Sequence, residues 1–318
     1  MAIIRAKGLT RINPPPVTGW RKMFHHSEET VAPVYDLTFS VDSDYTVVYG
    51  SDKDELTTMF RLLRGTLSPS VGTVTVFGQA PDSKQKHRIP FIGEVSERLA
   101  KELADDKPED CFARCKAEGA LPATEYLSRI SSLSLLFGIE TCLGQSFYRL
   151  TRNEQVRCML IMALLRDSKF LMLDSQTEHS DPSERTELRE FLKIHHAQQG
   201  TGIFLTSTRL EDTENAERVI VMDGGRIVFN DSGALFRKAV GNKKIVTLTL
   251  SEPPQLYGMP HARLIAQPSP LQMVLEVDLS RQSLRAFLEK LSKRLSITDI
   301  QAEELSFRQV VKKLNELR

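Results

Sequence analysis

Long apolar runs are missing from this chain. No stretch approaches the roughly 20 apolar residues that a helix needs to cross a bilayer. The first residues, Met1-Ala2-Ile3-Ile4-Arg5, lack the apolar core of a signal peptide. We therefore expect a cytoplasmic protein, which would bind peripherally to the cytoplasmic face if it serves a membrane.

Cysteine and net charge are also scarce. The 318 residues include four cysteines, which imply no disulfide framework: Cys111, Cys115, Cys142 and Cys158. Cys111 and Cys115 are spaced for one helix face, but no second pair and no nearby histidine completes a set of four metal ligands. The net charge of +1 gives no basic footprint for nucleic acid. The sequence thus argues against a disulfide scaffold, a zinc site and a nucleic-acid partner.

One stretch has the position of a phosphate-binding loop. Val47-Val48-Tyr49 predicts a buried parallel strand, and residues 56–67 carry apolar residues at helical spacing. The stretch that joins the strand to the helix and includes the first helical residues, 50–58, aligns with the pattern G-x-x-x-x-G-K-[ST]. In that pattern the second glycine lets backbone N–H groups surround a phosphate, the lysine reaches the outer phosphates and the hydroxyl holds Mg²⁺.

The chemistry of that loop is absent. Gly50 and a hydroxyl at Thr57 or Thr58 are retained, but Glu55 replaces the second glycine and Leu56 replaces the lysine. An acidic side chain among the N–H groups repels phosphate, and leucine supplies no donor. We therefore predict a nucleotide-binding fold with a disabled site.

Further segments follow in the order and spacing of one protein family. Residues 65–78 read G-T-L-S-P-S-V-G-T-V-T-V-F-G, residues 150–157 read L-T-R-N-E-Q-V-R, and residues 169–174 read K-F-L-M-L-D. Residues 203–208 read I-F-L-T-S-T, and residues 219–228 form an Asp-Gly-Gly hairpin pattern. Together they resemble ATP-binding cassette (ABC) ATPases over residues 1 to about 240, with the signature at 150–157 and the Walker B strand at 169–174.

The resemblance assigns roles that several residues cannot fill. Ser175 stands at the position of the catalytic glutamate, and a serine hydroxyl cannot accept the proton of the attacking water at neutral pH. Thr208 stands at the switch histidine. The remaining departures are Asn13 at the adenine-stacking aromatic, Glu94 at the glutamine loop, and Asn153 and Glu154 in the signature. The retained positions are Thr151, Asp174, a weak Mg²⁺ candidate, and Asp181 on the expected dimer face.

Each substitution alone is compatible with an ordinary surface or packing residue. Together, the losses at the phosphate loop, the catalytic glutamate, the switch histidine, the signature and the adenine-stacking position indicate either a pseudo-ATPase or a site rebuilt for another ligand. We expect no cofactor, with weak binding of ATP and Mg²⁺ as the remaining possibility. The alternatives are a slow ATPase that uses Lys53 for phosphate and Asp174 for Mg²⁺, and a soluble scaffold detached from transport.

The composition changes after Gly241. With 41% hydrophobic and 26% charged residues, the chain is long enough for two units. We predict an α/β ABC ATPase core at 1–240, with a helical lobe at about 95–165, and a small α+β domain at 241–318. In the second, the patterns predict strands at 244–250, 271–277 and 297–300 and helices at 281–291 and 305–317.

The resemblance also implies partners. Similar C-terminal tails occur in ATPases of the ABC-2 export type, which act as head-to-tail dimers on transmembrane subunits. We therefore expect a non-hydrolysing, structural or regulatory subunit of an ABC-2-type transporter complex, paired with itself or with another ABC ATPase.

Overall fold

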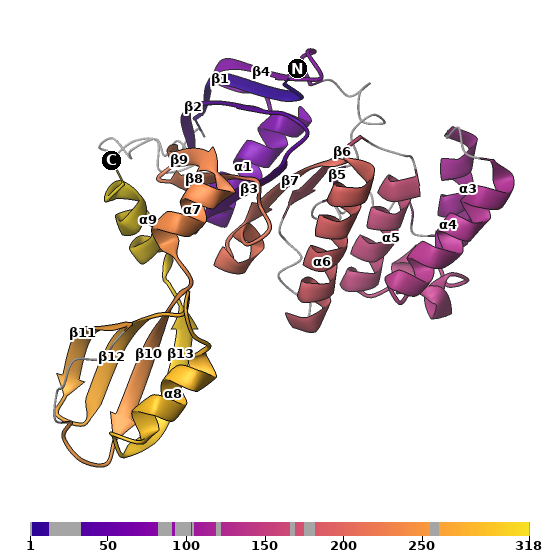
Figure 1. Ribbon diagram of the computed structural model, residues 1–318. Helices are drawn as coiled ribbons and strands as arrows, with labels where there is room; N and C mark the ends of the chain where they lie inside the picture. The colour runs from indigo at the N-terminus through magenta and orange to yellow at the C-terminus, as the bar shows by residue number, and fades with distance from the viewer. Residues whose placement is uncertain are drawn as a thin grey trace, which may run out of the picture. The chain divides into compact units, whose positions relative to one another are not determined.

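The computed structural model divides the chain into two compact units. It describes residues 2–12, 33–81, 91–92, 103, 105–118, 122–165, 169–174, 182–254 and 261–317 (Figure 1). Unit 1 is Met1–Asn230 and unit 2 is Asp231–Arg318. The boundary lies before the predicted position at 240/241, since helix α7 (Gly233–Val240) packs against α9 (Phe307–Asn315) within unit 2.

Unit 1 contains two sheets. The antiparallel sheet has the order β2-β1-β4, formed by Val34–Val41, Ile4–Arg11 and Val71–Val76. The larger sheet has the order β5-β6-β7-β3-β8-β9, formed by Phe91–Ile92, Phe170–Asp174, Gly202–Ser207, Tyr45–Gly50, Arg218–Asp223 and Arg226–Ser232. Its strands from β5 to β8 pair in parallel. The α/β class predicted from the sequence is confirmed.

The parallel strands are buried as their apolar runs predict. Every residue of β3, β6 and β7 is buried. The predicted hairpin also forms: β8 and β9 are joined by Gly224 and Gly225, whose φ angles are 58° and 71°. Two successive left-handed residues make a turn that matches strand twist, and glycine adopts this conformation without steric cost.

Helix α1 (Lys53–Arg64) packs between the two sheets (Figure 1). Its buried residues are Leu56, Met59, Phe60, Leu62 and Leu63, and they join a core cluster with residues of both sheets. The predicted helix at 56–67 is wrong at both ends. Asp52 caps the helix three residues earlier than predicted, and Gly65, with φ of 73°, ends it.

The helical part of unit 1 follows the predicted lobe. Its helices are α3 (Pro108–Glu118), α4 (Ala123–Leu136) and α5 (Arg152–Leu165), with short 3-10 turns at Glu140–Cys142 and Phe147–Arg149. Helix α5 packs against both α3 and α4. Beyond the lobe, α6 (Pro182–Gln199) and the 3-10 turn Leu210–Thr213 flank β7. Helices α3, α4 and α5 all lie within the range of about 95–165 that the sequence assigns to the helical lobe.

All four cysteines are buried, and none of them forms a disulfide. Within the described ranges, no group of three or more His, Cys, Asp or Glu side chains is arranged to hold a metal ion. In the same ranges, no helix combines the length and apolar character needed to span a membrane.

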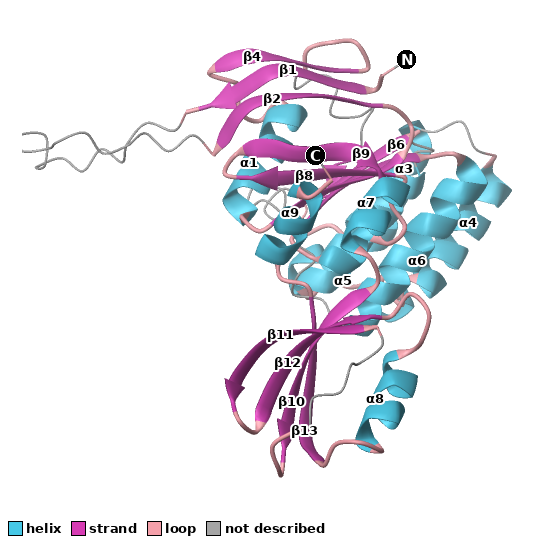
Figure 2. Cartoon of the chain, turned by 60° about the vertical axis from the view of Figure 1, so that its left-hand side comes forward, coloured by secondary structure: helices cyan, strands magenta, loops and turns pink. Residues whose placement is uncertain are grey.

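Unit 2 is a four-stranded antiparallel sheet covered on one face by a helix (Figure 2). The order is β11-β12-β10-β13, formed by Ala262–Ser269, Gln272–Asp278, Lys243–Leu250 and Ile297–Glu304. Helix α8 (Leu284–Ser292) packs on it through Phe287 and Leu291. The strands predicted from the sequence do not include β11, which contains Pro268. Since β11 is an edge strand, its proline removes no hydrogen bond that the sheet interior requires.

A substitution at Gly72 would test how closely β1 and β4 pack in the antiparallel sheet. Its φ is +84°, and a Cβ there would lie 2.2 Å from the Gly8 carbonyl oxygen. Gly72→Ala should therefore cost about 1–2 kcal/mol for the left-handed backbone and a further ~1–3 kcal/mol for the overlap. Denaturant unfolding would measure both.

Gly200 provides the matched control. Its φ is +64° and no atom lies within 4 Å of the added Cβ, so Gly200→Ala should cost only the backbone contribution. Equal losses in the two variants would contradict the packing argument.

Candidate functional site

The predicted site residues lie at one edge of the parallel sheet. Strands β3, β6, β7 and β8 run in parallel, so their carboxyl ends share that edge. This is where open α/β sheets bind ligands. Gly50 ends β3, Asp174 ends β6 and Thr208 follows β7. Four predicted site residues lie outside the described residues: Asn13, Glu94, Ser175 and Asp181.

The N-terminus of α1 is capped from within the chain. Asp52 Oδ1 accepts hydrogen bonds from the backbone N–H groups of Asp54 and Glu55, at 2.8 and 3.3 Å. These are two of the donors that a helix N-terminus leaves unsatisfied and that could otherwise bind an anion. The carboxylate of Asp52 thus lies where the helix N-terminus attracts negative charge.

Leu56 packs into the protein instead of extending from the loop. It is 2% exposed and belongs to the core cluster around α1. Its Cδ2 would lie 3.3 Å from a Cβ added to Gly50, so its side chain folds back over the end of β3. The sequence did not predict this packing role, although the apolar spacing of the helix includes Leu56.

Glu55 is half-buried beside the β8–β9 turn. Burial raises the pKa of its carboxyl, a hydrogen bond from the Gly225 backbone opposes that rise, and the nearby charges of Asp52 and Asp223 add to it. Three carboxyl groups therefore gather at the end of β3. The other loop residues lie along α1: Lys53 is exposed in its first turn, and Thr57 and Thr58 are half-buried in its second.

Asp174 is held by the neighbouring strand. It is 7% exposed, and its Oδ1 accepts a hydrogen bond of 2.7 Å from the Thr206 hydroxyl. The two residues are direct partners in the parallel register of β6 and β7. A metal ion at this oxygen would compete with the Thr206 hydroxyl. Thr208, two residues further on, is half-buried.

The predicted signature residues form a capping box. Thr151 donates from its backbone N–H and its hydroxyl to Glu154 Oε2, at 2.7 and 2.8 Å, and the Glu154 N–H donates to the Thr151 hydroxyl at 3.3 Å. Thr-x-x-Glu is the sequence pattern for this arrangement, so Glu154 has a structural role that the sequence could have predicted. Asn153, between them, is half-buried and lines a cavity.

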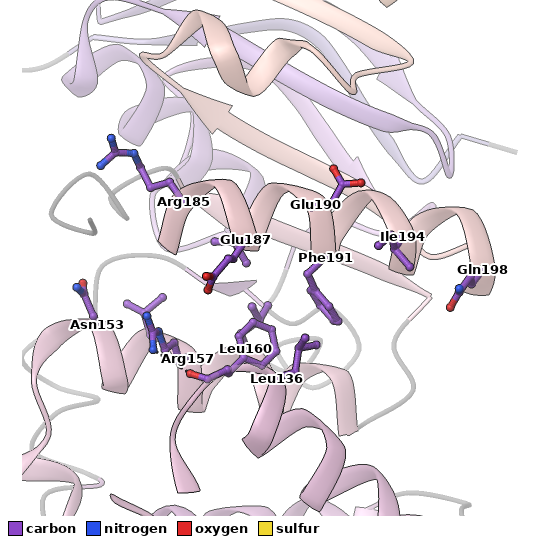
Figure 3. Close-up of a pocket in the computed structure, with 13 residues that line it drawn as sticks. Leu136, Asn153, Arg157, Leu160, Arg185, Glu187, Glu190, Phe191, Ile194 and Gln198 are labelled. Carbon is purple, nitrogen blue, oxygen red and sulfur yellow. Dashed lines mark hydrogen bonds between the residues drawn. The ribbon is translucent and has the colours of Figure 1, made fainter. Parts of the chain in front are cut away.

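That cavity lies between α4, α5 and α6 and has a volume of about 540 Å³ (Figure 3). Leu136, Leu160 and Phe191 contribute apolar surface, and Phe191 points from α6 toward the other two helices. The Phe137 and Phe191 rings meet edge to face, with centroids 4.9 Å apart. No residue of the loop 50–58 lines the cavity. Sequence patterns gave no sign of it, because its walls come from three segments far apart in the chain.

No family model matches the chain. The similar proteins of known function, in contrast, are ATP-binding proteins of transporters. The chain is 24% identical over 191 residues to the energy-coupling factor transporter ATP-binding protein EcfA1 of Mycoplasmoides gallisepticum, covering 59% of this chain and 67% of that protein. It is 24% identical over 225 residues to the ABC transporter ATP-binding protein NatA of Bacillus subtilis, covering 69% of this chain and 89% of that protein.

A solved structure supports the same fold. The structure of cbiO1 from Clostridium perfringens, described as part of the ABC transporter complex cbiONQ, superposes with a TM-score of 0.56 at 17% identity. The match covers 75% of this chain and 94% of that one. The chain therefore has the fold of the ABC ATPases, and the relatives to which its sequence is similar are ATP-binding subunits of transporters.

Proposed function

We propose that this chain is a non-hydrolysing ABC ATPase-like subunit with a structural or regulatory role in an ABC-2-type membrane transporter complex. The observation that carries the proposal is the N-terminus of α1. Asp52 uses two of its N–H groups, and Leu56 is buried at the position of the phosphate-binding lysine. A nucleotide phosphate would have to displace one carboxylate and approach a second, Glu55, so these residues do not fit it.

The signature region supports the same proposal. In a head-to-tail dimer, the N-terminus of α5 would face the nucleotide of the other chain. Here the first turn of α5 is capped by Thr151 and Glu154 of the same chain. A partner's phosphate would therefore meet a carboxylate instead of free N–H groups.

The comparisons supply the biological setting of the proposal. The similar proteins are named as ATP-binding proteins of transporters. One solved structure with a TM-score of 0.57 is a dimeric ATP-binding cassette bound to ADP and phosphate. We infer a homo- or heterodimer that contacts transmembrane subunits on the cytoplasmic face of a membrane. Unit 1 would act as the ATPase-like domain and unit 2 as an accessory domain.

A slow ATPase is the second candidate. It is favoured by the retained Asp174 at the carboxyl end of β6 and by Lys53, which is exposed in the first turn of α1. This activity would require Asp174 to exchange its bond with Thr206 for a metal ion. A soluble scaffold without transport partners is the third, and co-purification with integral membrane proteins separates it from the first two.

Isothermal calorimetry with MgATP tests the proposal directly. We expect a dissociation constant in the millimolar range or weaker, which corresponds to about 4 kcal/mol of binding free energy or less. Asp52→Ser keeps a capping oxygen but removes one charge, and it should stay in that range because Glu55 and Leu56 are unchanged. Micromolar affinity in the natural chain would overturn the proposal.

A second prediction concerns the catalytic position. Ser175→Glu supplies the missing base, but we expect Mg²⁺-dependent ATP hydrolysis to stay at the background of the natural chain. A base without a positioned phosphate gains no proximity effect. Turnover above background in a phosphate-release assay would show instead that the loop accepts nucleotide.

A third prediction concerns the helical lobe. Leu127 and Leu135 lie two turns apart on α4 and are 61% and 70% exposed, as expected for a contact surface. Leu127→Asp with Leu135→Asp should reduce co-purification of transmembrane subunits at least tenfold. Val71→Asp is the matched control, since Val71 is also 61% exposed but lies on β4. Equal recovery from both variants would remove the lobe from the proposed interface.

A further inference from the structure

Charge is unevenly divided between the two units. Unit 2, residues 231–318, contains 14 Lys or Arg and 9 Asp or Glu, a net charge of +5. Because the whole chain has a net charge of +1, unit 1 has a net charge of −4. A charge difference of this size between two parts of a chain points to an anionic partner for the basic part.

Most of the excess lies on and beside α8. Between residues 279 and 296 there are five basic side chains and one acidic side chain, Glu289. We call the exposed basic side chains the α8 ridge: Arg281, Arg285, Lys290, Lys293 and Arg294. The opposite side of the helix packs on the sheet through Phe287 and Leu291 (Figure 2). All five ridge side chains are exposed, whereas Phe287 and Leu291 are buried in the core of unit 2.

The ridge is less neutralised than the other basic residues of unit 2. Lys243 and Lys313 both reach Glu276, at 3.7 and 2.9 Å, and Lys244 reaches Glu304 at 2.8 Å. On the ridge, Arg285 pairs with Glu289 at 2.9 Å. Lys290 donates to the neutral amide oxygen of Gln282 at 3.1 Å, and no carboxylate of the described residues lies within 4 Å of its ammonium group.

For the last two ridge residues, Lys293 and Arg294, no acidic partner lies within 4 Å in the part of the chain that the structure describes. Because the C-terminal turn of α8 also carries Lys290, three cations gather there without a carboxylate to pair with.

We propose that the α8 ridge binds the surface of an anionic lipid bilayer. A cluster of basic residues on an amphipathic helix is attracted to acidic headgroups, and each basic side chain near the surface strengthens binding by about fivefold. Since the apolar side chains of α8 are held in the core, the contact is electrostatic and reversible, without insertion of the helix.

A bilayer fits the ridge better than a nucleic acid does. The ridge carries no exposed aromatic side chain on which a base could stack, because Phe287 is buried. Exposed cations gathered on one short helix and at its two ends instead suit an extended anionic surface. This inference extends the proposed position of the chain at a membrane.

Vesicle flotation with the full chain tests the inference. The natural chain should float with vesicles of phosphatidylcholine mixed with phosphatidylglycerol, should stay unbound with phosphatidylcholine alone, and should dissociate at raised salt. Replacing Lys290, Lys293 and Arg294 together by Gln should weaken binding about a hundredfold, from about fivefold for each residue. The vesicles contain no transmembrane subunit, so flotation can fail while the proposed transporter function holds. Equally, flotation can succeed while the proposed transporter function fails.

The matched control removes the same charge elsewhere in unit 2. Lys238→Gln with Arg308→Gln and Lys312→Gln changes three exposed cations on α7 and α9 and should keep most of the binding. Circular dichroism verifies that both triple variants fold. No flotation of the natural chain, equal losses in both triple variants, or tighter binding to a DNA duplex than to anionic vesicles would each overturn the inference.

Discussion

The burial of one face of α1 between two sheets is the constraint on which the rest of unit 1 depends. Five apolar residues of this helix are buried, and each contributes roughly 1.5–3 kcal/mol. Residues of β1, β2, β4, β6, β7 and β8 join the same cluster, so the helix fixes both sheets relative to each other. Because Leu56 belongs to the buried face, the first turn of α1 cannot turn this side chain toward a ligand without losing core packing.

Two helix N-termini in unit 1 obtain their negative charge from their own chain. Asp52 serves α1, and Glu154 with Thr151 serves α5. A helix needs its first N–H groups satisfied whether or not a ligand is present. A permanent internal carboxylate stabilises the fold without any dependence on nucleotide concentration, and this supports the structural role proposed above.

The sequence predicted elements where local pattern and tertiary packing agree. The buried strands at 170–174 and 202–207 and the Asp-Gly-Gly hairpin are of this kind. The start of α1 was wrong, because aligning the loop with a phosphate-binding pattern concealed the capping signal of Asp52. Strand β11 was missed, because Pro268 is acceptable only at a sheet edge, and strand order is a property of the whole unit. The cavity lined by Phe191 could not be predicted, since three distant segments form it.

The four buried cysteines allow local unfolding of the helical part of unit 1 to be followed by thiol labelling. Burial is the main cause that raises the pKa of the Cys111, Cys142 and Cys158 thiols, so little reactive thiolate exists at neutral pH in the closed state. Alkylating reagents can reach these sulfur atoms only when α3, α5 or the 3-10 turn Glu140–Cys142 separates from its neighbours. The rate of thiol labelling is therefore a direct measure of the local unfolding free energy of these helices, obtained without any added probe.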